Sequence, residues 1–204
     1  MKQNPSARGS RWPAYMLLPA ICCLALLFQP APARTGANGF PVQDDFKVTT
    51  VYFVRHAEKE AAPPQDPALT EAGKLRSQEL ARILAPSGIK TILTTQFLRT
   101  KLTAEPLAKQ LGITPRAVNI KMNPTNPRQV SEQSVREIVD RIYERAGEGI
   151  LVVGHTNTIP DIIKMLGGDP ALSIDEKRFD DLFIVTLYGK GKAKVAHLKY
   201  GSPG

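Results

Sequence analysis

Short runs of β-branched and aliphatic residues alternate along this chain with longer segments whose apolar residues recur at helical spacing. The runs are residues 48–54, 91–95, 150–153 and 183–188, with 194–200 as a further strand expected at an edge. The segments between them predict helices over residues 71–84, 98–111, 131–146 and 159–166. Strands that alternate with helices build βαβ units. The sequence therefore predicts an α/β fold, a three-layer sandwich with a mainly parallel central sheet, an antiparallel edge strand and helices on both faces.

The predicted helices carry start and stop signals and one apolar face each. Thr70 can cap the first helix, because its hydroxyl can accept a hydrogen bond from a free N–H of the first turn. The buried face of that helix is expected to hold Leu75, Leu80, Ile83 and Leu84. The third helix is expected to bury Val135, Ile138, Val139, Ile142 and Ala146. These faces predict the core, and nothing in them requires a cofactor.

The first 33 residues differ from the rest of the chain. They contain Lys2, Arg8 and Arg11 and no acidic residue, then an apolar segment over residues 14–28, then Ala-Pro-Ala at 31–33. This order is typical of a signal peptide cleaved near residue 34. An uncleaved anchor is the alternative, although spanning a bilayer takes about 20 apolar residues. A lipoprotein site at Cys22 or Cys23 would place a bulky Ile21 where a small residue is wanted.

Composition then defines the remaining chain. Both cysteines lie in the predicted signal peptide, so the mature protein would have no disulfide. Residues 34–46 read as a flexible leader, and residues 47–204 as one domain. The whole chain has a net charge of +8, 42% hydrophobic and 23% charged residues, which excludes a disordered or multi-span membrane protein. We expect an exported protein, periplasmic or secreted, with no stable membrane insertion after cleavage.

Polar residues follow three of the predicted strands where each strand ends. Arg55 and His56 follow the first strand, His155 and Asn157 follow the strand at 150–153, and Arg99 begins the helix after the strand at 91–95. Ligands of open α/β sheets bind at the carboxyl ends of the strands. Two of the three histidines and two arginines are therefore expected at one rim.

These residue types suit phosphate chemistry. Arginine presents planar, permanently charged donors that match phosphate oxygens. A neutral histidine can attack phosphorus and form a covalent phosphoenzyme, while a second, protonated histidine can stabilise the charge that moves in the transition state. Each element alone also has an ordinary structural interpretation, and it is the combination that favours a site.

Four segments, in order, resemble the histidine phosphatase superfamily, the phosphoglycerate mutase-like group. They are Val-Arg-His-Ala-Glu-Lys at 54–59, Leu-Thr-Glu-Ala-Gly at 69–73, Thr-Thr-Gln-Phe-Leu-Arg-Thr at 94–100 with Thr-Ala at 103–104, and Val-Gly-His-Thr-Asn at 153–157. The resemblance spans residues 48–168. It implies a phosphatase in which His56 is the phosphorylated nucleophile and Arg55, Arg99 and His155 complete the phosphate pocket. Asn157 would line the site, and no metal or organic cofactor is implied.

Two departures from the family pattern bear on activity. Ala57 stands where the family usually has glycine, and residues 118–123, where a proton-donating carboxylate is expected, contain no acid. General-acid help is typically worth about 10² to 10⁴ in rate, so its absence predicts a slow enzyme or one restricted to good leaving groups. Glu58, Glu105 and Asp161 are candidates with simpler interpretations: solvated beside Lys59, on a helix surface, and in the first turn of a helix.

Other functions are less well supported. A phosphate-binding or regulatory module on the same fold is the main alternative, and a phosphomutase is a weaker one. A three-histidine zinc site would need His197, in the predicted edge strand, and no carboxylate is evident to orient it. Nucleic-acid binding is disfavoured because the basic residues are scattered and aromatics make up only 6%. The expected partner is a small phosphorylated substrate, with phosphate or inhibitory oxyanions in the pocket. The loops at 60–68 and 119–129 would set specificity, and no pattern specifies an oligomeric state.

Overall fold

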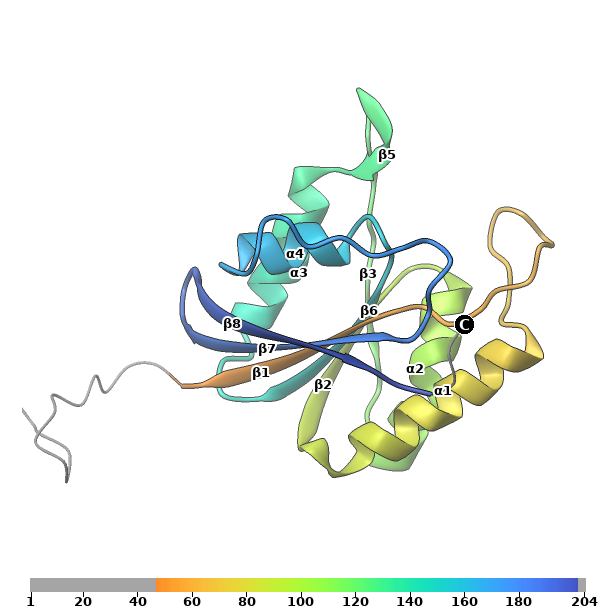
Figure 1. The fold of residues 1–204 in the computed structure, drawn as a ribbon, viewed down its shortest axis with the longest axis horizontal. Helices are drawn as coiled ribbons and strands as arrows, with labels where there is room; N and C mark the ends of the chain where they lie inside the picture. Colours follow the sequence, from red (N-terminus) through yellow and green to blue (C-terminus); the bar gives the residue numbers. More distant parts are fainter. Residues whose placement is uncertain (1–46, 202–204) are drawn as a thin grey trace, which may run out of the picture. The chain divides into compact units, whose positions relative to one another are not determined.

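A six-stranded sheet forms the centre of the molecule in the computed structural model, which describes residues 47–201 (Figure 1). Its strand order is β3-β2-β6-β1-β7-β8. The strands are β1 (Thr49–Arg55), β2 (Ile89–Thr95), β3 (Arg116–Val118), β6 (Gly149–Gly154), β7 (Asp181–Gly189) and β8 (Lys192–Lys199). The helices are α1 (Glu71–Leu84), α2 (Leu98–Leu111), α3 (Glu132–Tyr143) and α4 (Ile159–Met165), with a short 3₁₀ turn, η1 (Ala85–Ser87). The signal peptide predicted at residues 1–33 and the leader predicted at 34–46 lie outside the described residues.

The sheet is parallel through β3, β2, β6 and β1, and antiparallel at β1–β7 and β7–β8. The α/β class with mainly parallel strands is confirmed, and β8 is the predicted edge strand. The antiparallel pairing extends one strand further inward than expected. After α4 the chain returns without a helix, so β7 starts beside the carboxyl end of β1, with Leu182 opposite Val54. A parallel β7 would require a crossover connection, usually a helix.

Helices cover both faces of the sheet, as predicted. α1 and α2 pack on one face with Val54, Ile92 and Leu151, whereas α3 and α4 pack on the other with Phe53, Val152 and other core residues. Figure 1 shows the two helix pairs on opposite sides of the strands. Because neighbouring strand residues face opposite sides, strands buried on both faces read as continuous apolar runs.

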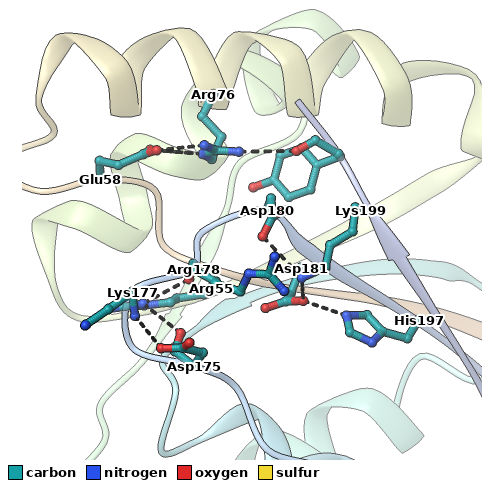
Figure 2. A network of polar contacts seen from close by, with 11 residues as sticks. Arg55, Glu58, Arg76, Asp175, Lys177, Arg178, Asp180, Asp181, His197 and Lys199 are labelled. Carbon is teal, nitrogen blue, oxygen red and sulfur yellow. Dashed lines mark hydrogen bonds and ion pairs between the residues drawn. The ribbon is translucent and has the colours of Figure 1, made fainter. Parts of the chain in front are cut away.

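Helix α1 has its predicted bounds, but its buried face differs. Thr70 Oγ1 accepts from the backbone N–H of Gly73 at 3.1 Å, which is the expected cap. Leu75, predicted to be buried, is 66% exposed, while its neighbour Arg76 is only 7% exposed. Arg76 is drawn inward because its guanidinium binds the carboxylate of Glu58 (Figure 2). The ion pair with Glu58 therefore buries Arg76, whereas the apolar pattern predicted that Leu75 would be buried.

The segment at residues 116–130 contains structure that the sequence did not predict. It holds β3 at the sheet edge and a hairpin of β4 (Met122–Asn123) and β5 (Asn126–Val130) inside the predicted loop. These strands are short and mostly exposed, so they lack the apolar alternation that marks a strand. Helix α3 ends at Tyr143, and Ala146, predicted to lie on its buried face, is exposed beyond that end. Within residues 47–201, no helix has the length and apolar character needed to cross a bilayer.

Candidate active site

His56 and His155 meet because they follow neighbouring parallel strands. Arg55 on β1 pairs with Gly154 on β6, and the backbone N–H of His56 donates to Gly154 O at 3.0 Å. The next residue on each strand is the histidine, and the two ring centroids lie 5.3 Å apart at an angle of 61°. Both side chains are nearly buried, with His56 4% and His155 7% exposed.

Arg55 and Arg99 flank the histidines, each stacked on an aromatic ring. The guanidinium carbon of Arg55 lies 4.1 Å from the ring centroid of Phe179, and that of Arg99 lies 4.3 Å from Phe97. Phe179 also contacts His56, at 6.1 Å between centroids, and Phe97 contacts His155 at 5.5 Å. The structure thus brings together the four residues proposed from sequence, with two phenylalanines that the sequence did not indicate.

Each of the two arginines buries a hydrogen-bond donor without an acceptor. The Nε atoms of Arg55 and Arg99 are buried and have no hydrogen-bond partner among residues 47–201. Arg55 is nevertheless held in place, because its Nη1 donates to the backbone oxygens of Glu176 at 2.5 Å and Arg178 at 3.0 Å. Buried polar groups are nearly always paired in native proteins. Cationic side chains with unpaired donors beside two neutral imidazoles favour an anionic ligand at this place.

The hydrogen bonds of the two rings decide which nitrogen can react. His56 Nδ1 lies 2.8 Å from its neighbour's carbonyl oxygen, that of Ala57. A carbonyl only accepts, so Nδ1 carries the proton and Nε2 of the neutral ring keeps its lone pair. His155 Nε2 lies 3.0 Å from Thr95 Oγ1, and its backbone N–H donates to Thr158 Oγ1 at 2.8 Å. Both rings are therefore oriented by the ends of strands and helices.

Burial controls the protonation of the histidines. Burial lowers the pKa of His56 to about 4; the hydrogen bond to Ala57 O opposes this, and the charges of Arg55 and Arg99 add to it. Burial and the same positive surroundings lower the pKa of His155 to about 2. Both imidazoles are thus neutral near pH 7 in the free protein. A bound dianion would reverse the sign of the local field and favour protonation.

Ala57 joins the nucleophile segment to α2. Its backbone N–H donates to Thr103 Oγ1 at 2.9 Å, and that hydroxyl donates to Arg99 O at 2.7 Å. The side chain of Ala57 is fully buried in the core, which accommodates the methyl group that the family's usual glycine lacks. One threonine therefore couples the segment carrying His56 to the helix turn carrying Arg99.

Asn157, predicted to line the site, contacts the β4–β5 hairpin. Its Nδ2 donates to the backbone oxygen of Arg128 at 3.0 Å, which ties the segment before α4 to the β4–β5 hairpin. The role of Asn157 at the site stays a prediction.

The three candidate carboxylates from sequence lie in separate environments. Glu58, expected to be solvated, instead receives Arg76 Nε and Nη2 at 2.8 to 3.0 Å. Glu105 pairs with Lys109 at 2.7 Å on the surface of α2, and Asp161 is exposed in the first turn of α4. The acid beside the pocket is one that sequence reasoning missed. Asp66 Oδ1 lies 3.9 Å from Arg99 Nη1, and its only signal was its place in the predicted rim loop.

The third histidine stands apart from this cluster, on the edge strand β8. His197 Nε2 lies 2.6 Å from Asp181 Oδ1, and its ring stacks on Phe183 at 4.4 Å. The expectation that no carboxylate would orient it was wrong. Among the residues that the structure describes, no group of three or more His, Cys, Asp or Glu side chains is placed to hold a metal ion.

Comparison with known proteins agrees with the resemblance in the sequence. The model of the histidine phosphatase superfamily (branch 1) matches residues 51–123, which include His56 and Arg99, so the resemblance is confirmed. No curated protein matches the chain.

Solved structures share the fold at low sequence identity. A mycobacterial glucosyl-3-phosphoglycerate phosphatase is 11% identical, with a TM-score of 0.59 over 76% of this chain and 100% of its own. The phosphoglycerate mutase from Bacillus anthracis is 17% identical, with a TM-score of 0.60 over 76% and 94%. The protein histidine phosphatase SixA, solved with tungstate, is 19% identical, with a TM-score of 0.56 over 74% and 96%. The fold is therefore one that phosphatases and a mutase use.

Proposed function

We propose that this protein is an exported phosphatase that hydrolyses phosphomonoesters through a phosphohistidine intermediate on His56. The observation that carries the proposal is the neutral Nε2 of His56 beside two arginines whose buried Nε–H groups have no acceptor in the described part of the chain. A nucleophile next to unpaired cationic donors suits a phosphoryl group. The complexes of two similar folds, SixA with tungstate and the mycobacterial phosphatase with inorganic phosphate, support an oxyanion as the ligand.

In the first step, Arg55 and Arg99 bind the non-bridging oxygens of the substrate phosphate. His56 Nε2 attacks phosphorus, the bond between phosphorus and the leaving oxygen breaks, and that oxygen takes a proton from water. His155 becomes protonated beside the bound dianion and donates to the phosphoryl oxygens as charge shifts onto them. Thr95 accepts from its other ring nitrogen.

In the second step, water attacks the phosphorus of phospho-His56, and the bond between phosphorus and Nε2 breaks. The ring holds its proton on Nδ1 throughout, because Ala57 O accepts that hydrogen bond. The phosphorylated ring is therefore cationic and leaves as neutral imidazole, a much better leaving group than an imidazole anion.

A phosphate-binding or regulatory module on the same fold is the second candidate. It is favoured by one observation: residues 118–123 supply no acid and Glu58 is engaged by Arg76. A phosphomutase is a weaker third candidate, since a signal peptide would remove the protein from cytoplasmic sugar phosphates.

Export rests on residues 1–33 and is tested separately. N-terminal sequencing of the protein recovered from the expressing cell should show a start near Arg34 in an exported fraction. A full-length chain confined to the cytoplasm would contradict export and favour the mutase alternative.

The central test compares the purified protein with His56→Ala on an aryl phosphate and a panel of phosphomonoesters. We expect phosphate release with a base-stable, acid-labile phosphate on the protein, and loss of both by at least about 10⁴-fold in His56→Ala. His197→Gln is the matched control and should retain activity, since His197 lies outside the pocket. Full activity in His56→Ala would contradict the proposal. Tight phosphate binding with no turnover on any substrate would favour the binding module.

A further inference from the structure

Asp66 is fixed at the edge of the arginine pocket by the loop that follows β1. Its Oδ1 accepts the backbone N–H of Leu98 at 2.8 Å, which closes the N-terminal turn of α2. The neighbouring residue on α2 is Arg99, whose Nη1 lies 3.9 Å from the same oxygen. The side chain is 46% exposed, so it borders both the pocket arginine and solvent. Figure 1 shows this loop, in orange, projecting beyond the carboxyl end of β1.

Three other carboxylates interact with a pocket arginine, and each is less well placed. Glu58, Asp175 and Glu176 all act electrostatically on Arg55. Glu58 binds Arg76 with both oxygens, and Asp175 Oδ1 accepts the backbone N–H of Lys177 at 2.9 Å. Glu176 is exposed and holds Arg55 through its backbone oxygen. Only Asp66 combines an oxygen fixed by a backbone N–H with a position beside Arg99.

We propose that Asp66 is the general base for hydrolysis of the phosphoenzyme. This proposal rests on the proposed function, since it requires phospho-His56. Water on the open side of the phosphoryl group gives a proton to Asp66 Oδ2 while its oxygen bonds to phosphorus. The phosphorus–Nε2 bond breaks, its electron pair returns to the imidazole, and inorganic phosphate is released. The protonated carboxyl then loses its proton to solvent.

The surroundings of Asp66 suit the second step better than the first. The Leu98 N–H donates to Oδ1 and the Arg99 guanidinium lies beside the same oxygen, so both neighbours position Asp66 as an acceptor toward water. Protonating a leaving oxygen would instead require Asp66 to donate a proton. Asp66 therefore gives no help when His56 is phosphorylated, so the rate of that step still depends on the leaving group. It accelerates the attack of water on phospho-His56, which is the same step for every substrate.

The test is Asp66→Asn in the full protein, followed by pre-steady-state kinetics with an aryl phosphate. The amide oxygen of asparagine can still accept from Leu98 N–H, so the loop and α2 keep their contact. We expect a burst of about one aryl alcohol per enzyme at a nearly unchanged rate, followed by turnover about 10²-fold slower. Phospho-His56 should accumulate in acid- and base-partition assays. The inhibition constant of inorganic phosphate should stay within about threefold of wild type.

A second variant separates catalysis from positioning of Arg99. Asp66→Ala also removes the hydrogen bond to Leu98 N–H. If Asp66 only positions Arg99, turnover should be normal in Asp66→Asn, and phosphate inhibition should weaken only in Asp66→Ala. That pattern overturns the proposal, as does a slower burst in Asp66→Asn. Asp161→Asn, an exposed carboxylate in the first turn of α4, is the matched control and should behave as wild type. If the burst appears in Glu176→Gln and not in Asp66→Asn, the general base is Glu176. This result also overturns the proposal for Asp66.

Different results would overturn the role of Asp66 and the proposed function. If wild-type protein turns over substrate and forms phospho-His56, but Asp66→Asn shows no accumulation, only the role of Asp66 is overturned. If no phosphate is ever found on His56 in either protein, both the proposed function and this inference are overturned.

Discussion

Two regions of this molecule bury charged side chains, and they differ in whether those side chains have hydrogen-bond partners. One is the pocket formed by Arg55, His56, Arg99 and His155. The other is called the edge network here and consists of charged residues from the β1 loop, α1, the start of β7 with the residue before it, and β8. Figure 2 shows it together with Arg55 of the pocket and the loop before β7. Its members are Glu58, Arg76, Asp180, Asp181, His197 and Lys199.

The edge network is internally satisfied. Asp181 accepts from His197 and from Lys199, Asp180 lies 3.2 Å from Lys199 Nζ, and Arg76 donates to both Glu58 and the backbone oxygen of Tyr200. Burial raises the pKa of Asp181, but the hydrogen bonds from Lys199 and His197 outweigh it and leave that pKa below its usual value.

The pocket has the opposite balance. Burial lowers the pKa of both histidines, and no carboxylate within hydrogen-bonding distance opposes it among residues 47–201. Two guanidinium Nε–H groups also stay without acceptors. Unpaired buried donors cost stability, so finding two cationic ones beside the histidine pair favours a ligand there. This contrast supports the proposal that the pocket binds an oxyanion, whereas the edge network has a structural role.

The largest effect is expected from removing a pocket arginine. Arg99→Leu should lower kcat/KM by about 10² to 10³, because it removes a charged donor from the developing phosphoryl charge. The same change should leave the free energy of unfolding equal or slightly higher, since an unpaired buried donor disappears. Arg82→Leu, from an exposed pair with Glu79, is the control and should change neither quantity. A large loss of stability with unchanged kcat/KM in Arg99→Leu would show that Arg99 has a structural role and contradict its role in the pocket.

The edge network should respond in the reverse way. Arg76→Leu leaves the partly buried carboxylate of Glu58 without its partner, which is expected to lower the free energy of unfolding by about 3 kcal/mol. Urea unfolding measures this, and phosphate inhibition measured on the folded variant should be close to wild type. A stable variant with weakened phosphate binding would show that the network is part of the site.

Acid should weaken the free protein through the pocket histidines. The folded-state pKa of His56, about 4, lies below its unfolded value of about 6.5, so only the unfolded chain takes up that proton between these limits. Stability is therefore full above pH 6.5 and falls as the pH drops toward 4, on the order of 3 kcal/mol from His56 alone. Urea midpoints at pH 6.5 and 4.5, in buffer without phosphate, measure the loss. An equal loss in His56→Gln would assign it to other groups.

The fold was largely readable from sequence where local signals agreed. Helices α1 and α2 have their predicted bounds, because capping or glycine signals coincide with clear apolar periodicity. The β4–β5 hairpin could not be predicted, since exposed strands of two and five residues carry no apolar alternation. The antiparallel direction of β7 was also not predicted, because it depends on how the chain after α4 returns to the sheet.

The site residues likewise include some that the sequence predicted and some that it could not predict. The positions of Arg55, His56, Arg99 and His155 follow from parallel strands that end at one edge, a rule that needs only strand assignments. The roles of Phe179, Thr95 and Asp66 depend on contacts between segments far apart in sequence, such as Asp66 with the first turn of α2. Leu75 and Arg76 show the converse, where one ion pair with Glu58 overrode the apolar pattern.

A crystal structure of the protein with tungstate would test the central claim most directly. We predict the oxyanion beside His56 Nε2, with its oxygens within about 3 Å of a guanidinium nitrogen of both Arg55 and Arg99 and of a ring nitrogen of His155. Tungstate bound elsewhere at saturating concentration, with no oxygen on either guanidinium, would contradict it.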